Sequence, residues 1–238
     1  MNEPTPMPYV RRDLWVILVT LALLLAWDFS GADLRVARWA DGADGFPWRN
    51  AWLTSHLLHD GGRLLAGAVL AALVIDALWR RPGTSLTVPA RWTAIGVVLT
   101  NLIVVPTLKR GSRTSCPWDL AEFGGRAQYV SHWAWGVADG GSGHCFPSGH
   151  AVAAFAFLAL YFAWREVRPA VARAWLVGVL VAGTLFGVGQ VLRGAHYPSH
   201  VAWSAWVCWT LAAVLDALSR RRQRRLGRRT AAAVGNPA

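Results

Sequence analysis

The sequence predicts an all-α fold, a bundle of six transmembrane helices with its polar chemistry in loops on the extracytoplasmic side. Of the 238 residues, 54% are hydrophobic and only 16% are charged, whereas a soluble domain is about 25% charged. The apolar residues also gather in blocks of about 17 to 25, the length that crosses a bilayer core. Six such blocks follow one another: 13–29, 62–79, 92–108, 149–165, 174–192 and 199–218.

The first block, 13–29, follows Arg11 and Arg12 and therefore resembles a cleavable signal. The residues that come after it, AWDFSGADL, contain no small-residue cleavage pattern. We expect this block to stay in the protein as a signal anchor and first span.

Arginines at the ends of the blocks predict the orientation. They precede the first block, separate the second from the third and the fourth from the fifth, and follow the sixth as RRRQRRLGRR. By the positive-inside rule both termini are then cytoplasmic. The net charge of +11 is explained by this placement, so we expect no nucleic-acid partner. We expect one membrane domain over 1–219 and a basic cytoplasmic tail over 220–238.

The connections 30–61, 109–148 and 193–198 then face the outside. In the first of them aromatic and polar residues alternate, which is typical of a helix lying in the membrane interface. This connection carries His56 and His59. We do not expect them to bind a metal, because no third ligand lies nearby.

Three stretches at this membrane face carry ionisable residues: LKRGSRTSCPWDLAEFGG (108–125), HCFPSGHA (144–151) and GQVLRGAHYPSHVAW (189–203). Ionisable groups at a membrane boundary are costly unless they reach water or serve a site. Snorkelling explains one lysine or arginine at a helix end, but not three clusters that include histidines. We therefore expect an extracytoplasmic active-site loop.

Helical spacing predicts which of these side chains lie together. Lys109, Arg113 and Cys116 share one face if the third span continues beyond the membrane. The residues Arg193, His196 and His200 share a face in the same way.

The fourth span is expected to begin at Ser148, because Pro147 favours extended backbone before a helix and Ser148 can cap it. The free backbone N–H groups at Ser148, Gly149 and His150 would then form an anion pocket. Together with the cations and the histidines they indicate a phosphate site. One histidine can attack phosphorus and another can protonate the leaving oxygen, while lysine and arginine supply positive charge. We expect no metal or other cofactor.

These residues resemble a family, the type 2 phosphatidic acid phosphatases, which are membrane lipid phosphatases related to vanadium haloperoxidases and bacterial acid phosphatases. Its proline-serine-glycine-histidine motif matches 147–150, between a first motif at 109–117 and a third centred on His196. The resemblance covers about 90 to 218. It implies that His196 is the nucleophile forming a phosphohistidine and that His150 is the general acid. It also implies that Lys109 binds phosphate, to which Ser148 and Gly149 donate.

The sequence departs from the family pattern at three positions. Cys116 and Gln190 stand where the family has arginine, and His200 stands where it has aspartate. We expect Arg113 and Arg193, each one turn from a lost arginine, to replace the missing phosphate contacts.

The group that orients His196 stays open at this point. His200 can accept its ring N–H, but a neutral imidazole stabilises the neighbouring cation less than a carboxylate does. Asp119 or Glu122 could fold over the site and do so instead.

We expect Cys116 and Cys145 to form a disulfide that ties the first motif to the second in a compartment that permits disulfides. The third cysteine, Cys208, is expected in the core. The loop residues His132 and His144 are expected to be solvated. A zinc site on His196 and His200 is the weaker reading, because neither the glutamate of the metalloprotease pattern nor a third ligand is evident.

The expected function is metal-independent hydrolysis of a phosphomonoester or diphosphate on a membrane lipid. Phosphatidic acid, undecaprenyl diphosphate, phosphatidylglycerol phosphate and lipid A phosphates all remain open as substrates, as does the oligomeric state. The resemblance to a bacterial branch implies the cytoplasmic (inner) membrane, with the active site facing the periplasm. The alternatives are a lipid phosphotransferase, an inactive lipid-binding or transport relative, and an intramembrane serine protease using Ser148 and His196. Phosphate release in EDTA separates the phosphatase from a zinc enzyme, a binder and a protease.

Overall fold

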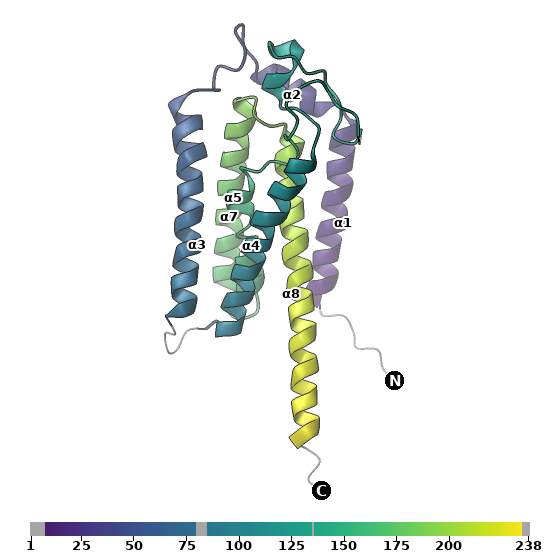
Figure 1. Cartoon of the computed structure of the whole chain (residues 1–238). Helices are drawn as coiled ribbons and strands as arrows, with labels where there is room; N and C mark the ends of the chain where they lie inside the picture. The colour runs from purple at the N-terminus through teal and green to yellow at the C-terminus, as the bar shows by residue number, and fades with distance from the viewer. Residues whose placement is uncertain (1–7, 80–84, 135, 235–238) are drawn as a thin grey trace.

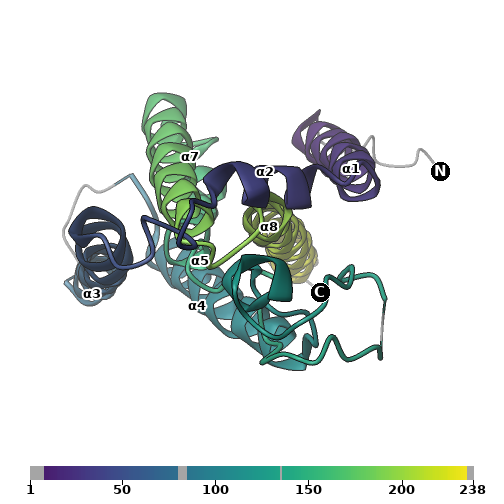
Figure 2. The ribbon, with the colours of Figure 1, turned by 90° about the horizontal axis from the view of Figure 1, so that it is seen from above.

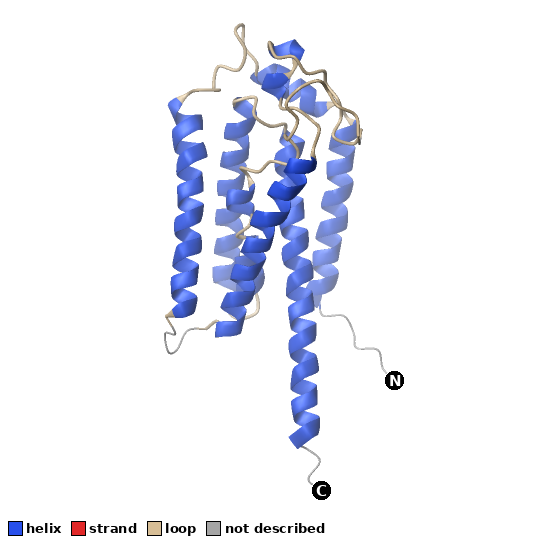
Figure 3. Cartoon of the chain, viewed as in Figure 1, coloured by secondary structure: helices blue, strands red, loops and turns tan. Residues whose placement is uncertain are grey.

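The computed structural model describes residues 8–79, 85–134 and 136–234. These residues form helices and loops, and within them the only β-type pairings are two isolated bridges, Gly42 with Gly45 and Leu120 with Ala127. Figure 3 shows the absence of strands from the described part of the chain. The prediction of an all-α fold is confirmed.

Long helices stand side by side and form the bundle (Figure 1). They are α1 (Pro8–Phe29), α3 (Gly62–Leu78), α4 (Val88–Gly111), α7 (Pro169–Leu192) and α8 (Pro198–Val234). Two short helices, α5 (Val152–Phe155) and α6 (Leu158–Trp164), lie among them, and η2 (Pro117–Asp119) and η3 (Ala121–Phe123) are single turns in the long loop. The loops and α2 (Ala32–Ala40) close one end of the bundle.

Four of the described helices are long and apolar enough to cross a membrane: Leu53–Leu78, Val88–Gly111, Pro169–Leu192 and Pro198–Gln223. A fifth span results if Tyr9–Phe29 and Ala32–Ala40, which meet at a bend of 67°, are taken together. A chain with this many apolar helices is a multi-pass membrane protein.

The fourth expected span, 149–165, differs from the prediction. It is the broken pair α5 and α6, and its apolar helical stretch is only Val152–Trp164. At 1.5 Å per residue this stretch is about 20 Å long, which is less than the bilayer core of about 30 Å. By length it therefore does not count as a span.

The position of α5 and α6 explains why this segment can be short. Its side chains are almost fully buried, as at Ala151, Leu158 and Phe162, and it packs against α4, α7 and α8. Protein surrounds the segment on several sides, so it forms the centre of the bundle. Continuous apolar sequence has the same appearance in a lipid-facing span and in a buried central helix.

The outer connection 30–61 contains helices, as expected, but in two parts. The first part, α2, lies across the end of the bundle, over α7 and α8 (Figure 2). The second part, η1 (Leu53–Gly61), is a π-helix that runs directly into α3. The second span therefore begins at Leu53 and brings polar residues of the expected loop into the bundle.

At the opposite end, buried ion pairs join three helices. Arg165, directly after α6, lies 2.6 Å from Asp13 of α1 and 2.7 Å from Asp216 of α8. The described part of the basic tail begins with Arg220, which also pairs with Asp216. It continues the helix α8 to Val234.

Candidate active site

A cavity of about 590 Å³ lies where α3, α4, α5 and α7 meet near the loop end of the bundle. Its polar wall carries three cationic side chains, three histidines and one amide: Arg63, Lys109, Arg193, His59, His150, His196 and Gln190. Its apolar wall comes mainly from α3 and α4, with Ala66, Leu70, Leu102 and Pro106. One cavity therefore joins a cationic end to an apolar end.

The three polar stretches found in the sequence meet at this cavity. Lys109 from the first, Gly149 and His150 from the second, and Arg193 and His196 from the third all line it. Of the other predicted site residues, Cys116 also lines it, whereas Arg113, Ser148, Cys145 and His200 do not.

Lys109 belongs to the last turn of α4 and lies against Gly149. A Cβ atom at residue 149 would lie 3.2 Å from the lysine Cδ and 3.7 Å from Nζ. The missing side chain of Gly149 therefore leaves room for the lysine. Lys109 lines the cavity, and among the described residues no carboxylate forms an ion pair with it.

The turn before α5 differs from the predicted helix start. The helix begins at Val152, not at Ser148. The Ser148 hydroxyl accepts a hydrogen bond from the Ala151 amide at 3.4 Å, within the turn that precedes the helix. However, the Ser148 amide donates to the carbonyl of His200 at 3.0 Å. It is not free, and only the amides of Gly149 and His150 lack a hydrogen-bond partner among the described residues of this turn.

His150 is held by residues of η1. Its Nε2 lies 3.1 Å from the Leu58 carbonyl, and its ring stacks on His59 with the ring centres 4.4 Å apart. A carbonyl only accepts, so Nε2 carries the hydrogen and Nδ1 is left to take up and release a proton. Burial lowers the pKa of His150 to about 4. The positive charges of Arg63 and Arg193 act in the same direction, and the bond to Leu58 opposes them.

His196 lies in the short break between α7 and α8 and is 4% exposed. Burial, together with the charge of Lys109, holds its pKa well below the ordinary value. Its ring is therefore neutral at physiological pH and keeps a nucleophilic lone pair. The interruption of the helix removes the common helical face on which the sequence placed this residue with Arg193 and His200. Arg193 and His196 nevertheless both line the cavity.

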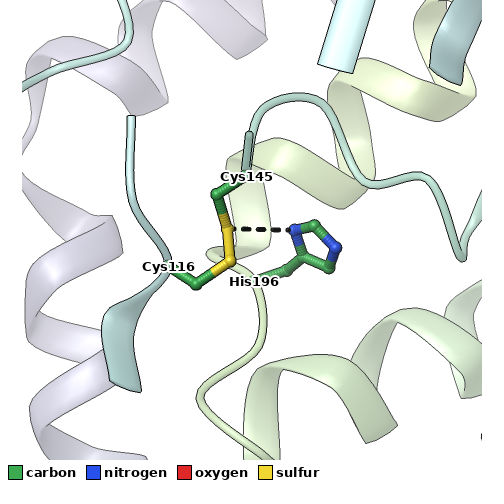
Figure 4. A group of neighbouring side chains, drawn as sticks. All are labelled: Cys116, Cys145 and His196. Carbon is green, nitrogen blue, oxygen red and sulfur yellow. Dashed lines mark hydrogen bonds between the residues drawn. A yellow bond between two sulfur atoms is a disulfide. The ribbon is translucent and has the colours of Figure 1, made fainter. Parts of the chain in front are cut away.

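Cys116 and Cys145 are joined by a disulfide, and His196 lies against it (Figure 4). Nδ1 of His196 is 3.5 Å from Sγ of Cys145. The two sulfurs and the imidazole have ligand atoms within 4.8 Å of one another. A disulfide sulfur is not a thiolate, however, so in this oxidised form the group has no set of ligands for a metal ion.

His200 does not form the expected bond to His196. It is 1% exposed in the first turn of α8, with the two ring centres 5.9 Å apart. Neither of its ring nitrogens has a hydrogen-bond partner among the described residues. The acidic alternatives are also engaged elsewhere, because Asp119 accepts from Ser142 at 3.0 Å and Glu122 pairs with Arg38.

The two arginines expected to compensate for the lost family arginines lie differently. Helix α4 ends at Gly111, so Arg113 is not on its face, and its guanidinium donates to the Gly136 carbonyl at 2.9 Å. Arg193 caps α7, lines the cavity and donates to the Arg49 carbonyl at 2.9 Å.

Three polar residues of the cavity were not predicted as site residues: His59, Arg63 and Gln190. His59 and Arg63 are four residues apart at the start of the second span, a spacing that suggests a shared helical face. Gln190 is 3% exposed, and its Nε2 has no hydrogen-bond partner among the described residues. A polar residue inside an apolar block was the available signal for it. His132, expected to be solvated, is instead bonded to Asp28 at 3.3 Å.

Comparison with known proteins identifies the family of the chain and a similar fold. The profile of the PAP2 superfamily matches residues 90–224, a range that includes Lys109, His150 and His196 but not η1 or α3. The crystal structure of the first transmembrane PAP2-type phosphatidylglycerolphosphate phosphatase from Bacillus subtilis is similar in fold, with a TM-score of 0.56 at 18% identity. The match covers 88% of this chain and 96% of that one. No curated protein matches the chain.

Proposed function

The chain belongs to the PAP2 superfamily, and from that premise we propose that it hydrolyses a phosphomonoester or diphosphate on a membrane lipid through a phosphohistidine, without a metal ion. The observation that carries this proposal is the single cavity shared by His196, His150, Lys109 and Arg193. It supplies a nucleophile, an acid and fixed positive charge from three separate segments.

The first chemical step is attack by the lone pair of His196 on phosphorus. A P–N bond forms, the bond from phosphorus to the lipid oxygen breaks, and His150 gives that oxygen a proton. Water then attacks the phosphohistidine, His150 takes up the proton of that water, and inorganic phosphate leaves. Neutral His196 suits the first role because burial suppresses its protonation.

The charge that develops on the phosphoryl oxygens is met by Lys109 and Arg193. Gln190 adds an amide donor, because this residue lines the same cavity and its buried Nε2 has no hydrogen-bond partner among the described residues. Such preoriented donors stabilise a transition state without reorganisation. The cations supply the charge that a magnesium ion supplies in other phosphoryl-transfer enzymes.

A lipid substrate is supported by the apolar wall of the cavity. Leu70 and Leu102 belong to helices that are long and apolar enough to span the membrane. A phosphate held at the cationic end can therefore keep its tails at bilayer depth. The similar Bacillus subtilis protein is by name a phosphatidylglycerolphosphate phosphatase, and we place phosphatidylglycerol phosphate with phosphatidic acid and undecaprenyl diphosphate in the substrate class.

The test is phosphate release by the purified chain in detergent micelles, with those three lipids and with EDTA present. We expect activity to survive EDTA and His196→Ala to lose at least about a thousandfold in kcat. The matched control is His144→Ala, an exposed histidine outside the cavity. Phosphorus-labelled lipid should leave a label on the wild type that is stable in alkali and released by acid.

Three outcomes contradict the proposal. Loss of activity in EDTA indicates a metal enzyme, and full activity of His196→Ala removes the nucleophile. Transfer of the label to a second lipid rather than to water indicates a phosphotransferase.

A further inference from the structure

Cys145, and not a carboxylate, is the hydrogen-bond partner of the His196 ring, through its backbone carbonyl as well as through its sulfur. Nδ1 lies 3.5 Å from Sγ of Cys145, and both residues are buried (Figure 4). No carboxylate of the described residues is hydrogen-bonded to this ring. His200, which stands where the family has a carboxylate, is not hydrogen-bonded to the His196 ring, and the two ring centres are 5.9 Å apart.

A sulfur in a disulfide carries no hydrogen and can only accept. The hydrogen of His196 must therefore lie on Nδ1 if the contact is a hydrogen bond, which leaves the lone pair on Nε2. The same sulfur lies 3.2 Å from the Ala195 carbonyl, but that contact is not a hydrogen bond, because neither atom carries a hydrogen. The disulfide thus favours one tautomer of the imidazole.

The backbone around Cys145 holds this sulfur in place. The amide of His144 donates to the Ser112 carbonyl and that of Cys145 to the Thr114 carbonyl, each at 2.9 Å. Nearby, Ser115 is bonded through its hydroxyl to Asp139 at 2.9 Å. The segments that carry the two cysteines are therefore paired by hydrogen bonds as well as by the disulfide.

We propose that the Cys116–Cys145 disulfide is the positioning group of His196: Sγ of Cys145 accepts the Nδ1 hydrogen and keeps Nε2 unprotonated for attack on phosphorus. This inference rests on the proposed function, since it gives the nucleophile its tautomer. A weak neutral acceptor does here what a carboxylate does in other histidine-dependent sites. The activity of the enzyme consequently depends on the oxidised state of the pair.

Reduction by a dithiol changes the contact. The reagent gives two electrons and two protons, the S–S bond breaks, two protein thiols form, and the reagent leaves as its cyclic disulfide. Cys145 is then free to rotate and carries a hydrogen that it can donate to Nδ1 or to the Ala195 carbonyl. His196 is no longer restricted to one tautomer.

The experiment uses the full chain in detergent micelles, before and after treatment with dithiothreitol. We expect reduction to lower kcat at least about tenfold and reoxidation to restore it, which shows that the fold survives. Nitrogen-15 NMR of the histidine rings, with the His196 signal assigned from the His196→Ala spectrum, should show the Nδ1–H tautomer only in the oxidised protein.

Variants separate the sulfur contact from the rest of the site. The double variant Cys116→Ala/Cys145→Ala should resemble the reduced wild type and be insensitive to dithiothreitol, although it keeps the Cys145 carbonyl. Cys208→Ala, which removes the buried free thiol, should respond to the reagent as the wild type does.

The outcomes are distinct from those of the proposed function. If His196→Ala is inactive but reduction leaves kcat and the His196 spectrum unchanged, the positioning role is overturned and the phosphatase stands. If reduction lowers kcat while the Nδ1–H tautomer persists, the disulfide acts only as a structural tie and the inference is again overturned.

Discussion

At the scale of single residues, the proposed mechanism requires the two site histidines to have opposite protonation states. Both are buried near cationic side chains, and both pKa values are lowered. For His196 this is favourable, because the nucleophile must be neutral. For His150 it is unfavourable, because the acid must carry a proton. Because the negative charge of an entering phosphate stabilises that proton, we expect substrate binding to raise the pKa of His150 and to favour its protonated form.

We expect Arg63→Gln to move the alkaline limb of the kcat/KM profile to higher pH. Protonated His150 is the active form, so kcat/KM falls as the pH rises through its pKa, which is about 4 in the free enzyme. Arg63 lowers that pKa, and its removal raises the pKa and extends the protonated range upward. The measurement is kcat/KM for phosphate release between about pH 4 and pH 9.

The control for this experiment is Arg126→Gln, an exposed arginine outside the cavity, whose limb should coincide with that of the wild type. The substrate's own ionisation near about pH 6 is common to all three proteins. If the alkaline limb of Arg63→Gln lies at the same pH as in the wild type, or at a lower pH, His150 is not the titrating acid.

Residue type and motif spacing predicted Lys109, His150, Arg193 and His196 as site residues, because each type suits one task in phosphoryl transfer. They could not predict which atom each side chain contacts. The partner of His196 is a sulfur because Cys145 lies against its ring. His59 and Arg63 were not predicted as site residues, because they belong to a separate segment that reaches the cavity only in the folded chain.

At the scale of elements, errors in the prediction come from helix ends. Helix α4 stops at Gly111 and α7 at Leu192. Arg113 therefore does not share a helical face with Lys109, and His200 does not share one with Arg193. In α5 and α6 the apolar run that was predicted as a span is broken, and its helical stretch is shorter than the other candidate spans. Hydropathy indicates that a segment has apolar surroundings, and both lipid and the protein core are apolar. Only the packing of the folded chain distinguishes a lipid-facing span from a buried central helix.

The packing of α5 against α7 depends on a glycine. A Cβ at Gly183 would lie 2.2 Å from Cε1 of Phe155, so we expect Gly183→Ala to destabilise the protein by about 1–3 kcal/mol through overpacking. Gly178→Ala, on the same helix with nothing within 4 Å of its Cβ position, should be neutral or slightly stabilising. Thermal unfolding in detergent measures both, and equal midpoints would contradict the close contact.

At the scale of the whole molecule, the two ends of the bundle differ in chemistry. The ion pairs of Arg165 with Asp13 and Asp216 join α1, α6 and α8 at the end where α1 begins. The cavity and the disulfide involve residues at the other end, among them Lys109 in the last turn of α4 and Arg193 after α7. The long loop and α2 close that end of the bundle (Figure 1). The arginine pattern of the sequence assigned these same ends to opposite sides of the membrane, and the separation of the two chemistries is consistent with that assignment.

We expect the loop end to face the periplasm and the end of α8 to face the cytoplasm. In a Cys208→Ala background, where the remaining cysteines form the disulfide, single cysteines are introduced as Asp44→Cys in the outer loop and Arg222→Cys on α8, both exposed positions. A membrane-impermeant maleimide should label Asp44→Cys in intact spheroplasts and Arg222→Cys only after lysis, because arginine-rich ends are retained in the cytoplasm. The reverse pattern would put the cavity in the cytoplasm, where thiol reductants keep cysteines reduced. Topology and the redox dependence of His196 are therefore linked: the sulfur contact persists only on the side of the membrane where the disulfide is stable.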